Sequence, residues 1–240
     1  MPNGLDNWIF WYQIKPEQWE HFLKDFHQYK PKIRLLSGVE TELCNEAGDI
    51  NIPFSEQAKL DFVQLSVHYM IDLDCLKMDL IEYPDVKSCP QFDNEVDRAK
   101  IERWRERTID VGEENIIAGL VNGYMNAIKK NKKVKSLAHM NDGLDTLRTY
   151  LVDLAKVKTS RKVEIFEPLF KLMAEENIMW EILGNIQEEA IIIRANEMNV
   201  PFTATADSHM LNEGWGPLVN HYKAEEIIEK YKLNRGRIEI

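Results

Sequence analysis

Five side chains of metal-binding type follow four short apolar segments of the sequence. Glu40 follows IRLLSGV, His68 follows FVQLSV, His139 follows VKSLA, and PFTATA runs into Asp207 and then His209. Three imidazoles and two carboxylates form a mixed nitrogen and oxygen set, which suits Zn, Mn or Fe and is too rich in nitrogen for Ca or Mg alone. Five ligands exceed the needs of one tetrahedral site, so we expect two ions that share a bridging carboxylate. Paired ions of this kind commonly serve the hydrolysis of phosphate esters or amides.

Taken singly, each of these residues has an ordinary structural interpretation. A histidine after a strand is often a hydrogen-bonded structural residue, Glu40 would cap a helix or pair with a lysine, and Asp207 would cap a turn. The same placement occurs after four different segments, however. This repetition favours one shared site over four unrelated structural roles.

The scaffold that positions these residues is expected to be a parallel α/β fold in one domain, residues 1–240. Apolar runs predict five strands, and segments of helical period alternate with them. The carboxyl ends of parallel strands open on one face of such folds, and Asp207 and His209, two positions apart in extended chain, share a side. The predicted strands are 33–39, 62–67, 134–138, 178–183 and 201–206. The predicted helices are 16–28, a brief one capped by Ser55, a pair between Asn94 and about Asn131 broken near Gly112, 142–156, 161–176, 187–198 and 224–232.

One long connection separates the second and third predicted strands. Residues 70–131 exceed what a simple crossover needs, and they are mostly of helical period after Asn94. We therefore expect a helical insert around 70–131 that acts as a lid or a specificity element.

Composition narrows the class of protein. The 240 residues are 44% hydrophobic with a formal net charge of −10, which fits a globular protein and disfavours a general nucleic-acid binder. No run approaches the ~18 apolar residues of a membrane span, and the N-terminal stretch lacks the basic region of a signal peptide. The three scattered cysteines, Cys44, Cys75 and Cys89, form neither a disulfide framework nor a zinc knuckle. A cytoplasmic protein with no nucleic-acid or membrane partner is expected, and its oligomeric state stays open.

Four motifs, taken in order, resemble those of a known family. LLSGVE, QLSVH, SLAHMN and TATADSH resemble the Gly-x-Glu, Ser-x-His, small residue–His and Asp-x-His motifs of the polymerase and histidinol phosphatase (PHP) family. The likeness runs from about residue 30 to 215 and is strongest to the histidinol-phosphatase-like phosphoesterases. Each motif alone is weak, whereas the ordered set is fairly specific.

The resemblance implies a fold and a set of roles. PHP domains are distorted seven-stranded βα barrels, similar to a TIM barrel, with a metal cluster of often three ions at the carboxyl ends of the strands. Carried over, Glu40 would bridge two ions, His68 and His139 would complete one of them, Asp207 would bind the second and His209 the third. One to three divalent ions, Zn, Mn or Fe, are therefore expected as cofactors. Asp207 and His209 are also the expected catalytic residues.

The sequence also departs from the PHP pattern. The family opens with a His-x-His motif on its first strand, and a further Asp-His follows the second strand; neither is present here. Five predicted strands plus two missing ones make seven. Only the ion held by Glu40, His68 and His139 keeps a full set of protein ligands. We therefore expect an incomplete barrel, either a fragment of a longer enzyme or a short form with an impaired centre.

Three functions follow from these observations. The first is a PHP-type hydrolase that cleaves a small phosphomonoester similar to histidinol phosphate by a metal-bound hydroxide, with Arg148 as the candidate phosphate-binding cation. The second is a truncated, catalytically impaired PHP-like protein that binds one metal ion or a protein partner. The third, a PHP module of a DNA polymerase, is disfavoured because no polymerase segment is present and the charge is acidic.

Overall fold

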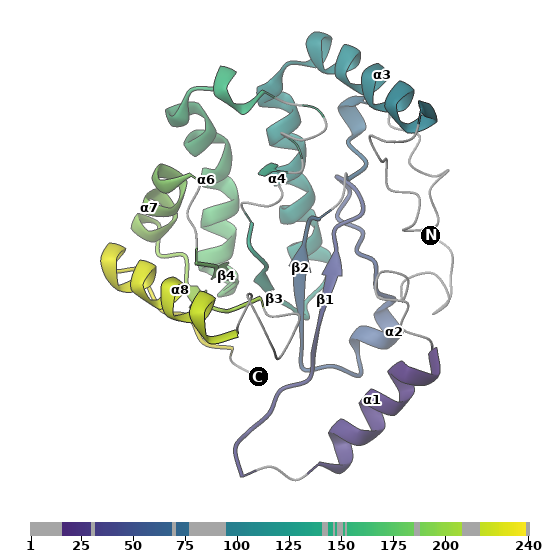
Figure 1. The fold of residues 1–240 in the computed structure, drawn as a ribbon, viewed down its shortest axis with the longest axis vertical. Helices are drawn as coiled ribbons and strands as arrows, with labels where there is room; N and C mark the ends of the chain where they lie inside the picture. Colours follow the sequence, from purple (N-terminus) through teal and green to yellow (C-terminus); the bar gives the residue numbers. More distant parts are fainter. Residues whose placement is uncertain are drawn as a thin grey trace.

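The protein is an α/β structure built around a five-stranded parallel sheet (Figure 1). The computed structural model describes residues 16–29, 32–68, 71–76, 95–140, 144, 145, 147, 151, 153–184, 188–207 and 217–238. Within these residues the spatial order of the strands is their order in the chain, β1-β2-β3-β4-β5, which leaves β1 and β5 at the two edges. The strands are β1 (Gly38–Glu42), β2 (Phe62–Ser66), β3 (Val134–Leu137), β4 (Met179–Ile182) and β5 (Phe202–Ala204).

Four of the five predicted strands are confirmed, and the first is wrong in its bounds. The predicted strand 33–39 is irregular up to residue 37, and β1 is the polar segment GVETE instead. The apolar residues Ile33 and Leu35, which suggested the strand, are 71% and 41% exposed. As a consequence Glu40 lies in the middle of β1 rather than after it.

The helices largely follow the sequence pattern. The expected break near Gly112 is confirmed, because Gly112 has a φ of 83° between α3 and α4, a value that glycine adopts readily. The predicted cap at Ser55 is wrong, since Ser55 lies inside the short helix α2 and Pro53 precedes it. The predicted helix 142–156 is interrupted, because residues 151 and 153 are not helical. The helices are α1 (Pro16–Gln28), α2 (Phe54–Gln57), α3 (Glu95–Val111), α4 (Glu113–Lys130), α6 (Thr159–Glu176), α7 (Glu189–Glu197) and α8 (Pro217–Tyr231), with 3-10 turns η2 (Asp74–Leu76) and η5 (Leu154–Lys156).

One face of the sheet is packed against helices. Phe166 and Phe170 of α6 stack in series with Trp180 of β4 and Phe202 of β5, with successive ring centroids 5.7–6.0 Å apart. All four side chains are at most 1% exposed. In Figure 1, α6, α7 and α8 lie beside the β4–β5 half of the sheet. Burial of this aromatic stack fixes the sheet against its helical layer.

The other face of the sheet is polar. Glu40 pairs in register with Gln64, Gln64 pairs with Ser136, and Glu181 pairs with Thr203. Paired residues of neighbouring parallel strands point to the same side, so polar groups from different strands gather on one surface. This surface carries the candidate site.

A segment near the C-terminus lies along β5. The amide of Phe202 donates to the carbonyl of Asn234 at 2.6 Å, and the amide of Gly236 donates to the carbonyl of Phe202 at 2.8 Å. The bridge between Phe202 and Arg235 is parallel. Part of the β5 edge is therefore paired with backbone from the same chain. Among the described residues, no helix is both long and apolar enough to cross a membrane.

Candidate metal centre

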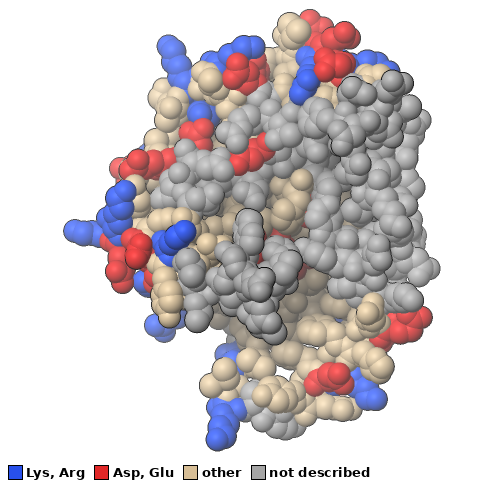
Figure 2. Space-filling view, viewed as in Figure 1, with Lys and Arg blue, Asp and Glu red and all other residues tan. Residues whose placement is uncertain are grey.

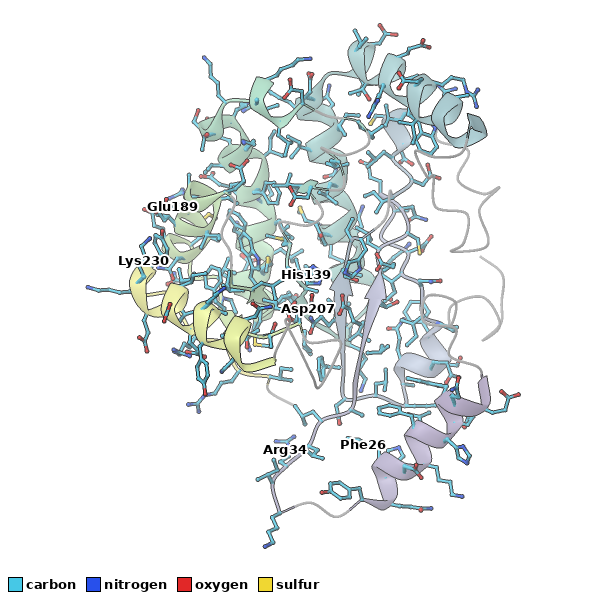
Figure 3. All side chains as sticks on the ribbon, in the orientation of Figure 1. Phe26, Arg34, His139, Glu189, Asp207 and Lys230 are labelled. Carbon is cyan, nitrogen blue, oxygen red and sulfur yellow. The ribbon has the colours of Figure 1, made fainter. Side chains whose placement is uncertain are left out.

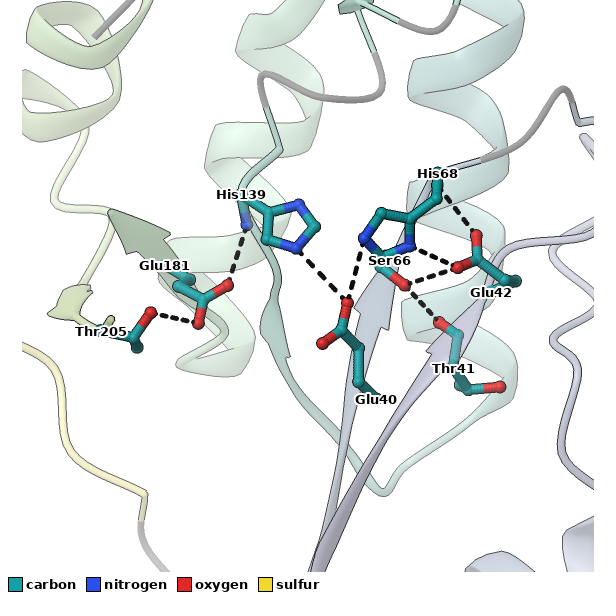
Figure 4. Close-up of polar contacts among 8 residues, drawn as sticks. All are labelled: Glu40, Thr41, Glu42, Ser66, His68, His139, Glu181 and Thr205. Atoms are coloured by element: carbon teal, nitrogen blue, oxygen red, sulfur yellow. Dashed lines mark hydrogen bonds and ion pairs between the residues drawn. The ribbon is translucent and has the colours of Figure 1, made fainter. Parts of the chain in front are cut away.

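Three predicted ligands from three successive strands meet on the polar face (Figure 4). Glu40 lies within β1, His68 follows β2 by two residues, and His139 follows β3 by two residues. The Oε1 atom of Glu40 is 3.4 Å from Nε2 of His139 and 3.6 Å from Nε2 of His68. The two imidazole ring centroids are 4.8 Å apart. These residues form a group that can hold a metal ion.

The donor separations fit a small divalent ion. The three ligand atoms all lie within 4.8 Å of one another. In a tetrahedral site with metal–ligand bonds of about 2.0–2.1 Å, neighbouring donors are about 3.3–3.4 Å apart. The two separations that involve Glu40 are close to this value, and the separation between the two histidine donors is at most 4.8 Å. Two nitrogens and one carboxylate oxygen also form a common ligand set for zinc and similar ions.

Glu42, which the sequence analysis did not select, holds His68 in place. Its Oε1 lies 2.5 Å from Nδ1 of His68, and its Oε2 accepts the backbone N–H of His68 at 2.9 Å. The hydroxyl of Ser66 donates to the same Oε1 at 3.2 Å. Because a carboxylate only accepts hydrogen bonds, Nδ1 of His68 must carry the proton. The lone pair of a neutral His68 is then on Nε2, which faces Glu40.

Opposing effects set the pKa values of Glu40 and His68. Burial alone would raise the pKa of Glu40, but the hydrogen bond with His139 and the positive charges of His139 and His68 outweigh it, so the pKa is lowered. Burial alone would lower the pKa of His68, yet the hydrogen bond and charge of Glu42 raise it overall. Both directions favour an ionised carboxylate at this site, next to a positive charge, in the absence of a metal ion.

Glu181 holds the backbone of His139 and lies on the side of this histidine away from Glu40 (Figure 4). Its Oε2 accepts the backbone N–H of His139 at 3.1 Å, and its Oε1 accepts the hydroxyl of Thr205 at 2.6 Å. The residue is 4% exposed, and burial raises the pKa of its carboxyl above the ordinary value. His139 has a φ of 23°, in the left-handed region that few residues other than glycine adopt.

The remaining predicted site residues are only partly placed. Asp207 follows β5 and has a φ of 44°, and Figure 3 shows it near His139 in projection. It is not part of the group of three ligands that the described residues form. His209 and Arg148 lie outside the described residues, as does Cys89. The structure therefore brings together three of the five predicted ligands.

Both supporting carboxylates leave a signal in the sequence. Glu40 and Glu42 are two apart in GVETE, so they point to the same side of a strand. Glu181 is the single charged residue of the buried strand MWEI. A search confined to residues that follow strands misses both, because these carboxylates lie inside strands.

Charges elsewhere on the visible surface are mixed. On the face shown in Figure 2, basic and acidic side chains of the described residues alternate around the rim. The described part of this face therefore shows no large area of one charge, unlike the candidate metal centre, where carboxylates gather on the polar face of the sheet.

No family model matches the chain, and no curated protein matches it in sequence.

Proposed function

We propose that this protein is a metal-dependent phosphoesterase of the PHP type, with a divalent ion held by Glu40, His68 and His139. The observation that carries the proposal is the convergence of these three side chains from adjacent parallel strands, at separations that suit one small ion. The lone pair of His68 faces the Glu40 carboxylate because Glu42 occupies its other nitrogen. This orientation turns Nε2 of a neutral His68 toward the carboxylate oxygen, so the nitrogen and the oxygen can act as ligands of one cation.

The chain's own residues prepare this site for a cation. Glu40 contributes negative charge, Glu42 holds His68 through its ring and its backbone N–H, and Glu181 holds His139 through its backbone N–H. When bound, Zn, Mn or Fe supplies Lewis acidity toward a phosphate oxygen and lowers the pKa of a bound water. Asp207 and His209 are the proposed additional ligands and catalytic residues, and Arg148 is the proposed cation for the phosphate group. The proposed substrate is a small phosphomonoester similar to histidinol phosphate.

The fold supports the same proposal. Parallel strands in sequential order, each followed by a helix or a long connection, are the arrangement found in βα barrels. In such barrels the site lies at the carboxyl ends of the strands, where His68 and His139 are placed. That the five parallel strands belong to a distorted, incomplete βα barrel is part of the proposal.

Metal content and turnover measured on the same sample test the proposal. The purified chain should contain at least one Zn, Mn or Fe per molecule and hydrolyse p-nitrophenyl phosphate or histidinol phosphate. Removal of the metal by a chelator should abolish turnover, and re-addition should restore it. His139→Ala should lose both metal and turnover, while Glu164→Gln, on the exposed face of α6, should retain both. Metal-replete protein without turnover of any phosphomonoester would contradict the phosphoesterase proposal.

One observation favours a second candidate, an impaired PHP-like protein that binds a single ion. Among the described residues, the group of ligands contains three side chains, which is the complement of one ion rather than of a cluster. For this candidate the same measurement should give one ion per chain and no turnover. Two or more ions per chain with turnover would exclude it.

A further inference from the structure

We propose that Glu181 is a positioning residue: its buried carboxylate holds the His139 ligand and the segment that leads to Asp207 in one fixed arrangement. The inference rests on the proposed metal site, which it deepens. Three strand ends meet at this one side chain. Glu181 belongs to β4, its Oε2 accepts from His139, two residues after β3, and its Oε1 accepts from Thr205, directly after β5.

The position of Glu181 is unusual for a carboxylate. All four residues of β4 are buried, and Glu181 itself is 4% exposed. A buried carboxylate is tolerated only when hydrogen bonds replace its lost hydration. Here the backbone N–H of His139 at 3.1 Å and the hydroxyl of Thr205 at 2.6 Å supply them, and the Gln64 side chain is a further partner. The carboxylate is therefore a junction between strands.

The backbone of His139 explains why such a junction is needed. With a φ of 23°, His139 is in a region that side chains disfavour, and an isolated chain would relax away from it. The hydrogen bond from its N–H to Glu181 is specific to this conformation. It fixes the direction in which the imidazole leaves the backbone, and with it the 3.4 Å separation from Glu40.

The contact with Thr205 extends the same role to β5. Thr205 is two residues before Asp207, which also has a positive φ, of 44°. By binding Thr205, Glu181 ties the end of β5 to the end of β3. The carboxylate thus couples the position of His139 to the segment that carries Asp207.

Two substitutions separate geometry from charge. In Glu181→Gln the amide oxygen can accept the His139 N–H while the amide nitrogen donates to the Thr205 hydroxyl, so both links survive without the charge. Glu181→Leu removes both links but suits a buried strand. Thr205→Val removes only the β5 link, and Glu164→Gln, on the exposed face of α6, is the control.

The experiment combines Co²⁺ titration with amide exchange in the metal-free protein. Glu181→Leu should weaken Co²⁺ binding at least tenfold and change its visible absorption spectrum, whereas Glu181→Gln and Glu164→Gln should bind within about threefold of the wild type. In the metal-free protein, exchange of the His139 amide should accelerate at least tenfold in Glu181→Leu and should stay slow in Glu181→Gln.

Each outcome decides the inference. Unchanged Co²⁺ binding and unchanged His139 exchange in Glu181→Leu would overturn it, and so would a loss in Glu181→Gln equal to that in Glu181→Leu, since charge would then be what matters. If Glu181→Leu fails to fold, faster His139 exchange in Thr205→Val supports the junction and unchanged exchange overturns it. If the wild type binds no Co²⁺, the metal site proposal fails, while the exchange data still test Glu181.

Discussion

His68 is held by Glu42 at two points, its ring and its backbone. The ring nitrogen Nδ1 lies 2.5 Å from one carboxylate oxygen of Glu42, and the backbone N–H of the same histidine donates to the other oxygen at 2.9 Å. Glu42 ends β1 and His68 follows the adjacent strand β2, 26 positions later in the chain. Glu42 therefore determines which ring nitrogen is turned toward Glu40, and it does so before any ion binds.

Removal of this support should weaken metal binding. We expect Glu42→Ala to reduce the affinity for Zn²⁺ about 10- to 100-fold, because the outer partner of a histidine ligand fixes its tautomer and raises its basicity. Glu42→Gln, which can still accept the Nδ1–H, should lose less. Isothermal titration of the metal-free protein with Zn²⁺ measures both changes. Glu164→Gln serves as the control. Equal Zn²⁺ affinity of Glu42→Ala and the wild type would show that Glu42 does not support metal binding.

The thiol of Cys44 should be unreactive in the folded protein. Burial, followed by the charges of Glu42 and Asp49, raises the pKa of Cys44 to about 12. The thiolate is the reactive form, so at pH 8 alkylation by iodoacetamide should be at least about 100-fold slower than in the unfolded chain. Peptide mapping of native and urea-unfolded samples by mass spectrometry checks this rate. Rapid labelling of Cys44 in the native state would show that its environment is open, whereas the exposed Cys75 should be labelled sooner.

Lys162 and Glu188 join the start of α6 to the start of α7. The lysine Nζ lies 2.5 Å from the carboxylate, and the two side chains are 7% and 21% exposed. Lys162→Met should lower the free energy of unfolding by about 2–3 kcal/mol, because it leaves a partly buried carboxylate without its partner. The double variant Lys162→Met/Glu188→Gln should recover most of that loss. Urea denaturation of Lys162→Met, Glu188→Gln and the double variant measures the coupling, and additive losses would show that the pair is not coupled.

Asp49 provides a stability contribution with a defined pH dependence. The hydrogen bond from Lys130 at 2.7 Å, aided by that from Asn45, lowers the pKa of Asp49 below its ordinary 3.8. Its contribution is therefore complete above pH 3.8 and is lost as the pH falls through the lowered pKa. Asp49→Asn should cost about 0.5 kcal/mol at pH 7, a small value because the pair is partly exposed.

Urea denaturation at two pH values tests this sign. The difference between Asp49→Asn and the wild type should be present at pH 7 and should shrink as the pH falls below 3.8. A difference that grows on acidification would mean that the carboxyl group is stabilised in its protonated form instead.

How far the sequence predicts this fold depends on which faces of a strand are buried. The runs at β2 to β5 are rich in Val, Leu, Ile and Phe, and their predicted positions are confirmed. The bounds of β1 were wrong because only Thr41 is buried in GVETE, while its two glutamates point to the site. Ile33 and Leu35 resemble strand residues but lie exposed in an irregular segment. Hydrophobicity therefore finds strands with a buried face and misses an edge strand whose residues serve the site.

The site residues that could be predicted from the sequence are those that follow apolar strands. His68 and His139 were predictable because each comes directly after an apolar strand, and parallel strands bring such positions together. Glu42 and Glu181 were not predicted, because their roles depend on cross-strand contacts of 26 and 42 residues in sequence separation. Pairing register, which sets those contacts, cannot be read from one strand alone.

The strand order of the sheet has a consequence for biosynthesis. Because each strand joins the edge left by its predecessor, the sheet can grow in the direction in which a ribosome delivers the chain. The nascent polypeptide carries all three metal donors once residue 139 has emerged, before β4 exists. Glu181 and Thr205 arrive afterwards, so the last strands synthesised complete the candidate metal centre after its three proposed ligands have been made.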